Sequence, residues 1–181
     1  MRELSLHILD IAENAISADA RHIDLAIVED VDANLLSITV SDDGRGMDTS
    51  AVVQARDPFF TTRATRHVGL GIPLFAAAAE RCGGGLTIES VPGKGTTVVA
   101  TFQHNHIDRA PLGNVPGTLM CVLMRGDNFG LHYLHRVGDR TFEFDTDEIK
   151  EELGGVPLSY PSVREWLGSF IVQGEQQLEE N

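Results

Sequence analysis

Several residue types are scarce in this sequence, and each shortage excludes a class of protein. The 181 residues include only two cysteines, Cys82 and Cys121, which is too few for a disulfide framework. Nowhere does an apolar run approach the roughly 20 residues that a membrane-spanning helix needs. The N-terminal segment is amphipathic and lacks the layout of a signal peptide. We therefore expect a cytoplasmic protein that is not anchored in a membrane.

Positive charge is scarce as well. Fourteen Lys and Arg residues stand against 27 Asp and Glu residues, which gives a formal net charge of -13. A field of this sign disfavours nonspecific binding to nucleic acids and to anionic lipids. The apolar fraction of 42% and the charged fraction of 23% are ordinary for a globular protein of one domain or slightly more. We expect neither a nucleic acid nor a membrane surface among the partners.

Hydrophobic periodicity indicates an α+β protein. Apolar residues at helical spacing predict helices, and apolar residues that alternate with polar ones predict half-buried strands. The expected elements are helices at residues 3–18, 49–55 and 71–81 and strands at residues 23–27, 36–40, 86–90 and 96–102. Paired strands beside helices predict a two-layer α/β sandwich, with helices on one face of a mixed, mainly antiparallel sheet.

The periodicity breaks where proline and glycine gather after the last of these strands. We expect a first domain at residues 1–103, a linker at 104–117, a small α+β appendage at 118–175 and a disordered tail at 176–181. Within the appendage, a hairpin is expected around Gly138, a helix behind Asp145 as its N-cap, and a last helix from Pro161. The apolar stretch 118–125 fits either a helix or a strand.

An aspartate before a Gly-x-Gly turn is the first sign of chemistry. Asp42 ends a predicted strand, and Gly44 and Gly46 follow it. Because adenine presents an exocyclic amine as a donor, a buried carboxylate is a natural acceptor for it, and the glycines allow the backbone close to the base. Met47 can pack on a purine or fill a gap in the core. Taken alone, this motif is also compatible with an ordinary turn.

A second glycine loop opens a predicted helix. In Gly69-Leu70-Gly71 the backbone N–H groups can turn toward phosphate oxygens, assisted by the helix N-terminus. Thr62 and Arg63 belong to a short polar and basic segment just before it, which suggests phosphate contact in an otherwise acidic chain. A solvated surface loop is the alternative, since neither the dinucleotide fingerprint nor the P-loop lysine motif is present.

Two polar residues on the first predicted helix form a candidate mechanistic pair. Asp10 and Asn14 are one helical turn apart, so their side chains can enter the same cleft. The amide oxygen of Asn14 can ligate Mg²⁺, and Asp10 can orient or deprotonate an attacking hydroxyl or water. Glu13 lies about 100° further around the helix and is less well placed as a base. An exposed polar helix face is the alternative interpretation.

The order of these segments resembles the GHKL ATP-binding superfamily, which groups gyrase, the heat-shock chaperone ATPases, histidine kinases and mismatch-repair ATPases. The matching segments are residues 10–15, 42–46, 57–63, 69–72 and 93–96. The resemblance covers about residues 1–103 and implies the Bergerat fold, with ATP and Mg²⁺ as cofactors. The lid side is similar to histidine kinases, whereas the helix side is more similar to mismatch-repair ATPases.

The resemblance also implies roles for individual residues. Asn14 corresponds to the Mg²⁺ ligand, Asp42 to the adenine-binding acid, and Thr96 to the threonine that supports adenine binding. The two glycine boxes correspond to Gly44 and Gly46 and to Gly69 and Gly71. Asp10 is the candidate base, but its position usually holds glutamate in the hydrolysing branches, and aspartate is one methylene shorter.

These implications predict an Mg²⁺-dependent ATP-binding protein that acts as an ATPase or phosphotransferase on a protein partner in trans. No helical pair with a phosphoacceptor histidine precedes the ATP-binding segments, so we expect a histidine-kinase catalytic domain alone. One alternative is a regulatory protein that ATP switches between partner-binding states with little turnover. Another is an ATP-gated dimer like the mismatch-repair ATPases, against which the short lid argues.

Overall fold

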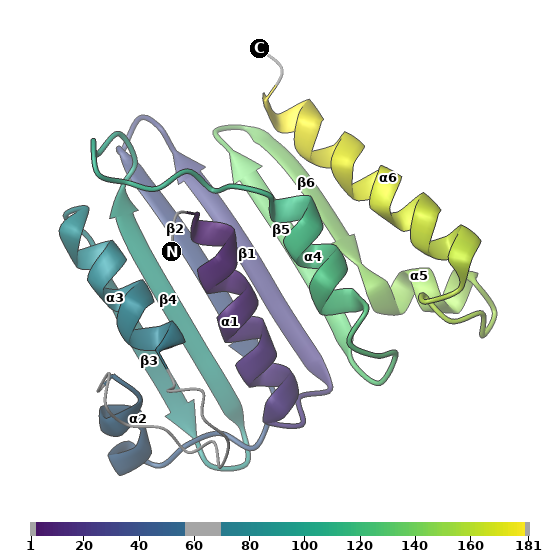
Figure 1. Cartoon of the computed structure of the whole chain (residues 1–181), viewed down its shortest axis with the longest axis horizontal. Coiled ribbons are helices and arrows are strands. Elements are labelled where there is room, and N and C mark those ends of the chain that lie inside the picture. The colour runs from purple at the N-terminus through teal and green to yellow at the C-terminus, as the bar shows by residue number, and fades with distance from the viewer. Residues whose placement is uncertain (1–2, 57–69, 180–181) are drawn as a thin grey trace.

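A computed structural model describes residues 3–56 and 70–179 of the chain. Its strands form one six-stranded sheet in the order β3-β4-β2-β1-β5-β6 (Figure 1). The strands are β1 (His22–Asp30), β2 (Leu35–Asp42), β3 (Gly85–Val91), β4 (Gly95–Gln103), β5 (Gly130–Val137) and β6 (Arg140–Asp145). The helices are α1 (Leu4–Ser17), α2 (Thr49–Ala55), α3 (Gly71–Arg81), α4 (Val115–Leu123), α5 (Thr146–Glu152) and α6 (Pro161–Glu179).

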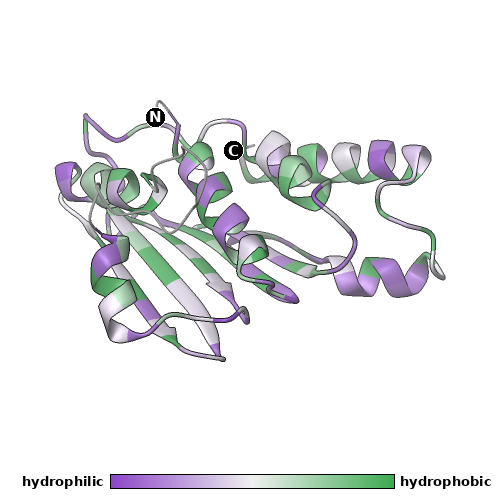
Figure 2. Ribbon diagram, turned by 60° about the horizontal axis from the view of Figure 1, so that its bottom comes forward, coloured by the Kyte–Doolittle hydropathy of each residue, from purple (hydrophilic) through white to green (hydrophobic). Residues whose placement is uncertain are grey.

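The sheet is mixed and mainly antiparallel, as the sequence predicted. Only β1 and β5 pair in parallel, whereas the four other pairs of neighbouring strands run antiparallel. Helices α3, α1, α4 and α6 lie side by side over one face of the sheet (Figures 1 and 2). This two-layer arrangement confirms the expected fold class.

The core lies between the sheet and these helices. The apolar stripe of α1 is buried, with Leu4 and Ile8 each 1% exposed, because residues three and four apart share one helix face. Ile23 and Ile27, which share one face of β1, are fully buried as well. His7 is also buried and stacks on the ring of Phe75 in α3. The helical period of 3.6 residues and the strand period of 2 residues therefore identified correctly which faces of α1 and β1 point into the core.

The C-terminal part continues the same sheet. Strand β5, which follows the expected linker, pairs with β1 of the first part of the chain. The apolar stretch after that linker is helical in α4, whose N-cap residue Asn114 accepts a hydrogen bond from the Gly117 N–H at 2.9 Å. The expected hairpin is present as β5 and β6. The division of the chain into two domains stays a prediction.

The last helix is longer than the sequence suggested. α6 begins at Pro161, as expected, but continues to Glu179 and so includes residues that were expected to lie in a disordered tail. Leu178 near its end is only 3% exposed, and this burial explains why the helix persists.

A buried polar network joins α6 to the centre of the sheet. His135 of β5 is 4% exposed, and its ring lies 2.9 Å from Glu175 of α6 and 3.2 Å from Glu29 of β1. Tyr133 donates to the same Glu175 at 2.8 Å, and His104 lies 2.7 Å from Glu29. Burial alone lowers the pKa of His135, but the hydrogen bonds to the two carboxylates outweigh it and raise this pKa to about 9.

The network predicts a loss of stability at alkaline pH. Because the folded-state pKa of His135 lies above its ordinary value of 6.5, the stabilisation is fully present below pH 6.5 and is lost as the pH rises through about 9. We expect the free energy of unfolding in urea to fall by on the order of 2 kcal/mol between pH 6 and pH 9.5. A His135→Gln variant should show a flatter profile, and equal pH dependence in both proteins would contradict this assignment.

Candidate functional site

The predicted adenine-binding acid lies at the end of β2, directly opposite Thr96 at the start of β4. The carboxylate of Asp42 is half-buried and accepts a hydrogen bond from the Gly44 N–H at 2.8 Å. Burial raises the pKa of Asp42, while hydrogen bonds from the backbone of Gly44 and Thr96 act in the opposite direction. These two amides orient the carboxylate and leave it with further capacity to accept hydrogen bonds.

The structure distinguishes two adjacent aspartates that the sequence presents together. Asp43 accepts hydrogen bonds from the backbone N–H groups of Arg21 at 2.7 Å and His22 at 2.9 Å. Its carboxylate therefore fixes the chain at the start of β1. Asp42 lies on the helix-covered face of the sheet, together with the buried side chains of Leu36, Ile38 and Val40.

The glycines of the first loop are required by contacts within the chain. A Cβ atom at Gly44 would lie 2.8 Å from the carbonyl oxygen of Ala18, and one at Gly46, whose φ is +65°, would collide with the carbonyl of Val91. Gly95 has φ of +102° and would collide in the same way with the carbonyl of Asp42. The loop is thus held closely against the turn between β3 and β4.

A serine that the sequence did not single out joins these segments. The Ser90 hydroxyl accepts a hydrogen bond from the Met47 N–H at 2.8 Å and lies 2.8 Å from the Thr96 hydroxyl. Ser90 was missed because a serine in a strand carries no local signal of function. Its position five residues before Gly95 was the available clue.

At the other end of the site, α1 meets the first turn of α3. A Cβ atom at Gly71 would lie 2.9 Å from the Cβ of Asp10 and 3.2 Å from its Oδ2. The candidate base therefore lies against the N-terminus of α3, where backbone N–H groups are directed outward. Leu70 is the N-cap of this helix, and its side chain cannot accept a hydrogen bond. The structure thus brings together Asp10 and Gly71, the last residue of the second glycine motif.

The other polar residues of α1 differ in their surroundings. Asn14 is one turn after Asp10, and both side chains are partly exposed. Glu13 forms an ion pair with Arg125, beyond the end of α4, so its carboxylate is engaged away from Asp10. This pairing agrees with the preference for Asp10 over Glu13 as a candidate base.

Three of the predicted site residues, Thr62, Arg63 and Gly69, lie outside the described residues. Their roles in phosphate binding stay predictions from the sequence.

Across the described part of the chain, no group of three or more His, Cys, Asp or Glu side chains is placed to hold a metal ion. The amide oxygen of Asn14 is of the kind that Mg²⁺ accepts, since this ion commonly keeps its waters and takes one or two protein oxygens together with substrate phosphates. No helix within residues 3–56 and 70–179 is long and apolar enough to cross a membrane.

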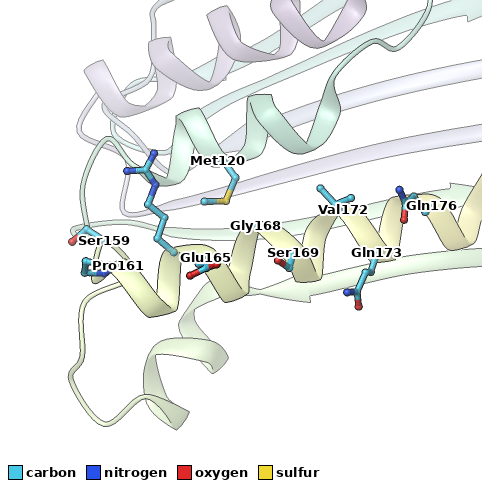
Figure 3. Close-up of a pocket in the computed structure, with 10 residues that line it drawn as sticks. Met120, Ser159, Pro161, Glu165, Gly168, Ser169, Val172, Gln173 and Gln176 are labelled. Carbon is cyan, nitrogen blue, oxygen red and sulfur yellow. The ribbon is translucent and has the colours of Figure 1, made fainter.

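A hollow of about 840 Å³ lies elsewhere, between α4 and α6 (Figure 3). Met120 projects toward α6 near Gly168, and Val172 lies further along the same helix. None of the predicted nucleotide-site residues that the structure describes lines this hollow, so it contributes nothing to that assignment.

Comparison with known proteins agrees with the geometry. Residues 2–106 match the family described as histidine kinase-, DNA gyrase B- and HSP90-like ATPases. The sensor protein kinase FleS of Pseudomonas aeruginosa is 37% identical over 108 residues, which cover 60% of this chain and 26% of FleS. A putative sensor protein of Shewanella frigidimarina is 28% identical over 103 residues, covering 56% of this chain and 16% of that protein. The chain spans about a quarter or less of the length of these relatives.

A solved structure shares the fold over a longer stretch. The N-terminal domain of a DNA repair protein superposes with a TM-score of 0.52 at 14% identity, covering 79% of this chain and 52% of that one. At this identity the likeness concerns the fold alone. The family match covers more than half of the chain, and the chain therefore belongs to the histidine kinase-, DNA gyrase B- and HSP90-like ATPases, with an ATP-binding domain of that family at residues 2–106.

Proposed function

We propose that this protein binds ATP with Mg²⁺ and acts as an ATPase or phosphotransferase on a protein partner in trans. Two observations support the proposal, one for each of the acids that the motif order assigns to the nucleotide site. Asp42 is half-buried opposite Thr96, and Asp10 lies against the first turn of α3. The similarity to sensor kinases supports the proposal, although the chain corresponds to only part of those proteins.

The base of the nucleotide would lie against Asp42. Its carboxylate, oriented by the Gly44 and Thr96 amides, accepts a hydrogen bond from the exocyclic amine of adenine. Partial burial strengthens such a bond because little water competes for the acceptor. Met47 lies in the same loop and is partly buried, so that it can contribute an apolar contact to the purine.

The phosphates would lie near the N-terminus of α3. Backbone N–H groups at Leu70 and Gly71 favour an anion there, whereas a carboxylate at Asp10 opposes one. A divalent cation removes this conflict, and Asn14 on the same helix offers the oxygen that would hold it. When bound, Mg²⁺ neutralises charge on the phosphate oxygens during transfer.

Phosphoryl transfer in such a site depends on positioning and electrostatic stabilisation. Asp10 would accept the proton of the attacking hydroxyl or water as its oxygen bonds to the γ-phosphorus, while the bond from that phosphorus to the β–γ bridging oxygen breaks and ADP leaves. Gly69, Thr62 and Arg63 would contact the phosphate oxygens, a role that rests on the sequence.

A second candidate function is that of an ATP-switched regulator with little turnover. It is favoured by Trp166 of α6, which is 51% exposed and stacks on Phe170 at a centroid distance of 5.4 Å. This aromatic surface lies outside the family match and can contact another protein. Phe144, by contrast, is only 7% exposed and belongs to the core.

The first prediction concerns the binding of the adenine base by Asp42. Asp42→Asn should weaken ATP binding at least about 10- to 100-fold, because it removes the negative charge and half of the acceptor capacity. Isothermal calorimetry with MgATP measures the effect. Asp43→Asn is the matched control, since its amide oxygen can still accept from Arg21 and His22. Unchanged ATP affinity in Asp42→Asn would remove this residue from the adenine site.

The second prediction concerns Asp10 as the proposed catalytic base. Asp10→Asn should leave the dissociation constant for ATP within a few-fold of the original, yet reduce the rate of ADP formation about 100-fold or more. A coupled assay under single-turnover conditions separates the two effects. Full turnover in this variant shows that another group accepts the proton.

The third prediction separates the two functions. Incubation with γ-labelled ATP, Mg²⁺ and host lysate should transfer the label to water, to this chain or to another protein if the protein is an enzyme. Multiple-turnover ADP production supports the enzyme. Partner binding that depends on ATP, with no more than one ADP formed per chain, supports the regulator.

A further inference from the structure

Strand β6 is one of the two edges of the sheet (Figure 1). Within the described part of the chain only β5 pairs with it, so its other side has no strand partner. The opposite edge, β3, is covered, because α2 packs on it and the Arg56 guanidinium donates to the backbone carbonyl of Leu86 at 2.6 Å. An uncovered edge of a sheet is a template to which another strand can be added.

The contacts of β5 show which backbone groups of β6 point outward. The Leu131 N–H donates to the hydroxyl of Thr146, the residue that follows β6, at 2.7 Å, so it is directed toward the β6 side of β5. Backbone groups of every second residue point to the same side of a strand. His135 therefore bonds toward β6 as well, and its partner in the register is Phe142. The backbone of Phe142 accordingly faces inward, toward β5.

The residues on either side of Phe142 face the other way. Thr141 and Glu143 direct their backbone N–H and C=O groups away from β5, and both residues are exposed. Among residues 3–56 and 70–179, no turn or loop forms a backbone–backbone hydrogen bond with either of them. These donors and acceptors follow one another at the spacing of a strand, so an extended chain is the structure that can pair with the whole row.

On the helix-free face of the sheet, negative charge lies beside this edge. The Glu143 carboxylate is 52% exposed and lies 2.8 Å from Nε2 of His132. Asp24, which is 53% exposed, lies 3.1 Å from Nδ1 of the same ring. Two carboxylates thus share one imidazole, which carries at most one positive charge. Since opposite charges on directly facing residues stabilise a strand pair, lysine or arginine is favoured opposite Glu143.

On the helix-covered face, the edge presents aromatic surface. The partly buried ring of Phe142 lies 5.4 Å from that of Phe170 in α6, measured between centroids. Phe170 in turn stacks on Trp166, which is 51% exposed. Helix α6 crosses close above the strand here, because a Cβ atom at Gly174 would lie 2.1 Å from the Phe142 ring. An apolar side chain is therefore favoured opposite Phe142.

A second copy of this chain does not suit the edge. Two symmetric antiparallel copies whose outward groups meet must be centred on Thr141, Phe142 or Glu143. The first centre places Glu143 opposite Asp139, and the second places Asp145 opposite Asp139. The third places Glu143 opposite its own copy. Each register therefore opposes like charges, which destabilises strand pairing, and the net charge of -13 adds to the repulsion.

We propose that β6 is a docking edge for an extended segment of a partner protein, which adds to the sheet as a further strand. The segment carries a basic residue opposite Glu143 and, next to it, an apolar residue opposite Phe142. Its backbone satisfies the outward groups of Thr141 and Glu143. The inference does not depend on nucleotide binding, because β6 lies outside the family match and contains none of the predicted nucleotide-site residues.

The test selects peptides on the full chain from a phage-displayed library of random linear sequences and measures the affinity of the enriched peptides by fluorescence polarisation. Enriched sequences should place a basic residue next to an apolar one. Thr141→Pro should weaken their binding at least about 10-fold, because proline lacks the outward N–H while every bond to β5 is kept. Thr141→Val is the matched control, since it keeps the N–H and should leave the affinity unchanged.

Glu143→Lys is a second variant, independent of the folding of Thr141→Pro. It should weaken the same peptides about 3- to 10-fold, because it places like charges opposite each other. Glu89→Lys makes the same change of net charge on the exposed face of β3, at the other edge, and should leave the affinity unchanged.

Three results would overturn the proposal. One is a selection that enriches no peptide, and another is a set of enriched peptides that bind Thr141→Pro and Glu143→Lys as well as the original protein. The third is a dimer in sedimentation that Thr141→Pro abolishes, since a second copy would then occupy the edge. ATP binding measured by calorimetry should be the same in all these variants, so that failure of the docking edge leaves the proposed function untouched.

Discussion

The close packing of backbone at the end of β2 is the constraint on which the site depends. Gly95 approaches the carbonyl of Asp42 so closely that any side chain would collide with it, and Gly46 approaches Val91 in the same way. Only glycine also adopts the positive φ of both positions readily. This contact brings the Thr96 and Gly44 amides to the Asp42 carboxylate, and it places Ser90 within reach of Met47. The acid is therefore oriented before any ligand arrives, which lowers the entropy lost on binding.

The same sheet links this site to the C-terminal part of the chain. Strand β1 pairs with β2, which carries Asp42, and with β5, which carries His135. The carboxylates of Glu29 and Glu175, which are only 15% and 13% exposed, flank that histidine, so that removal of one partner would leave a poorly solvated charge without compensation. The residues after the family match are thus part of the architecture that holds the nucleotide-binding strands in place.

Much of the fold was predictable because its signals are local. The helix spacing of Leu4 and Ile8, the alternation at Ile23 and Ile27, and the helix cap at Asp145 each depend on residues within a few positions of one another. The candidate site was predictable in its residue types, since the order of its glycine and acidic motifs matches a family. The state of residues 118–125 and the extent of α6 were not, because burial against distant elements decides whether an apolar stretch is a helix and where it ends.

The sequence by itself determined the class of fold, the family and the set of acidic and glycine residues that can serve a nucleotide. Tertiary structure alone decided that the Asp43 carboxylate binds the backbone N–H groups of Arg21 and His22, that Asp10 meets the start of α3, and that β5 adds to the sheet beside β1. Ser90 belongs to this second group. Its three partners come together only when the first glycine loop packs on the β3–β4 turn, 43 residues further along the chain, and no local pattern encodes such a contact.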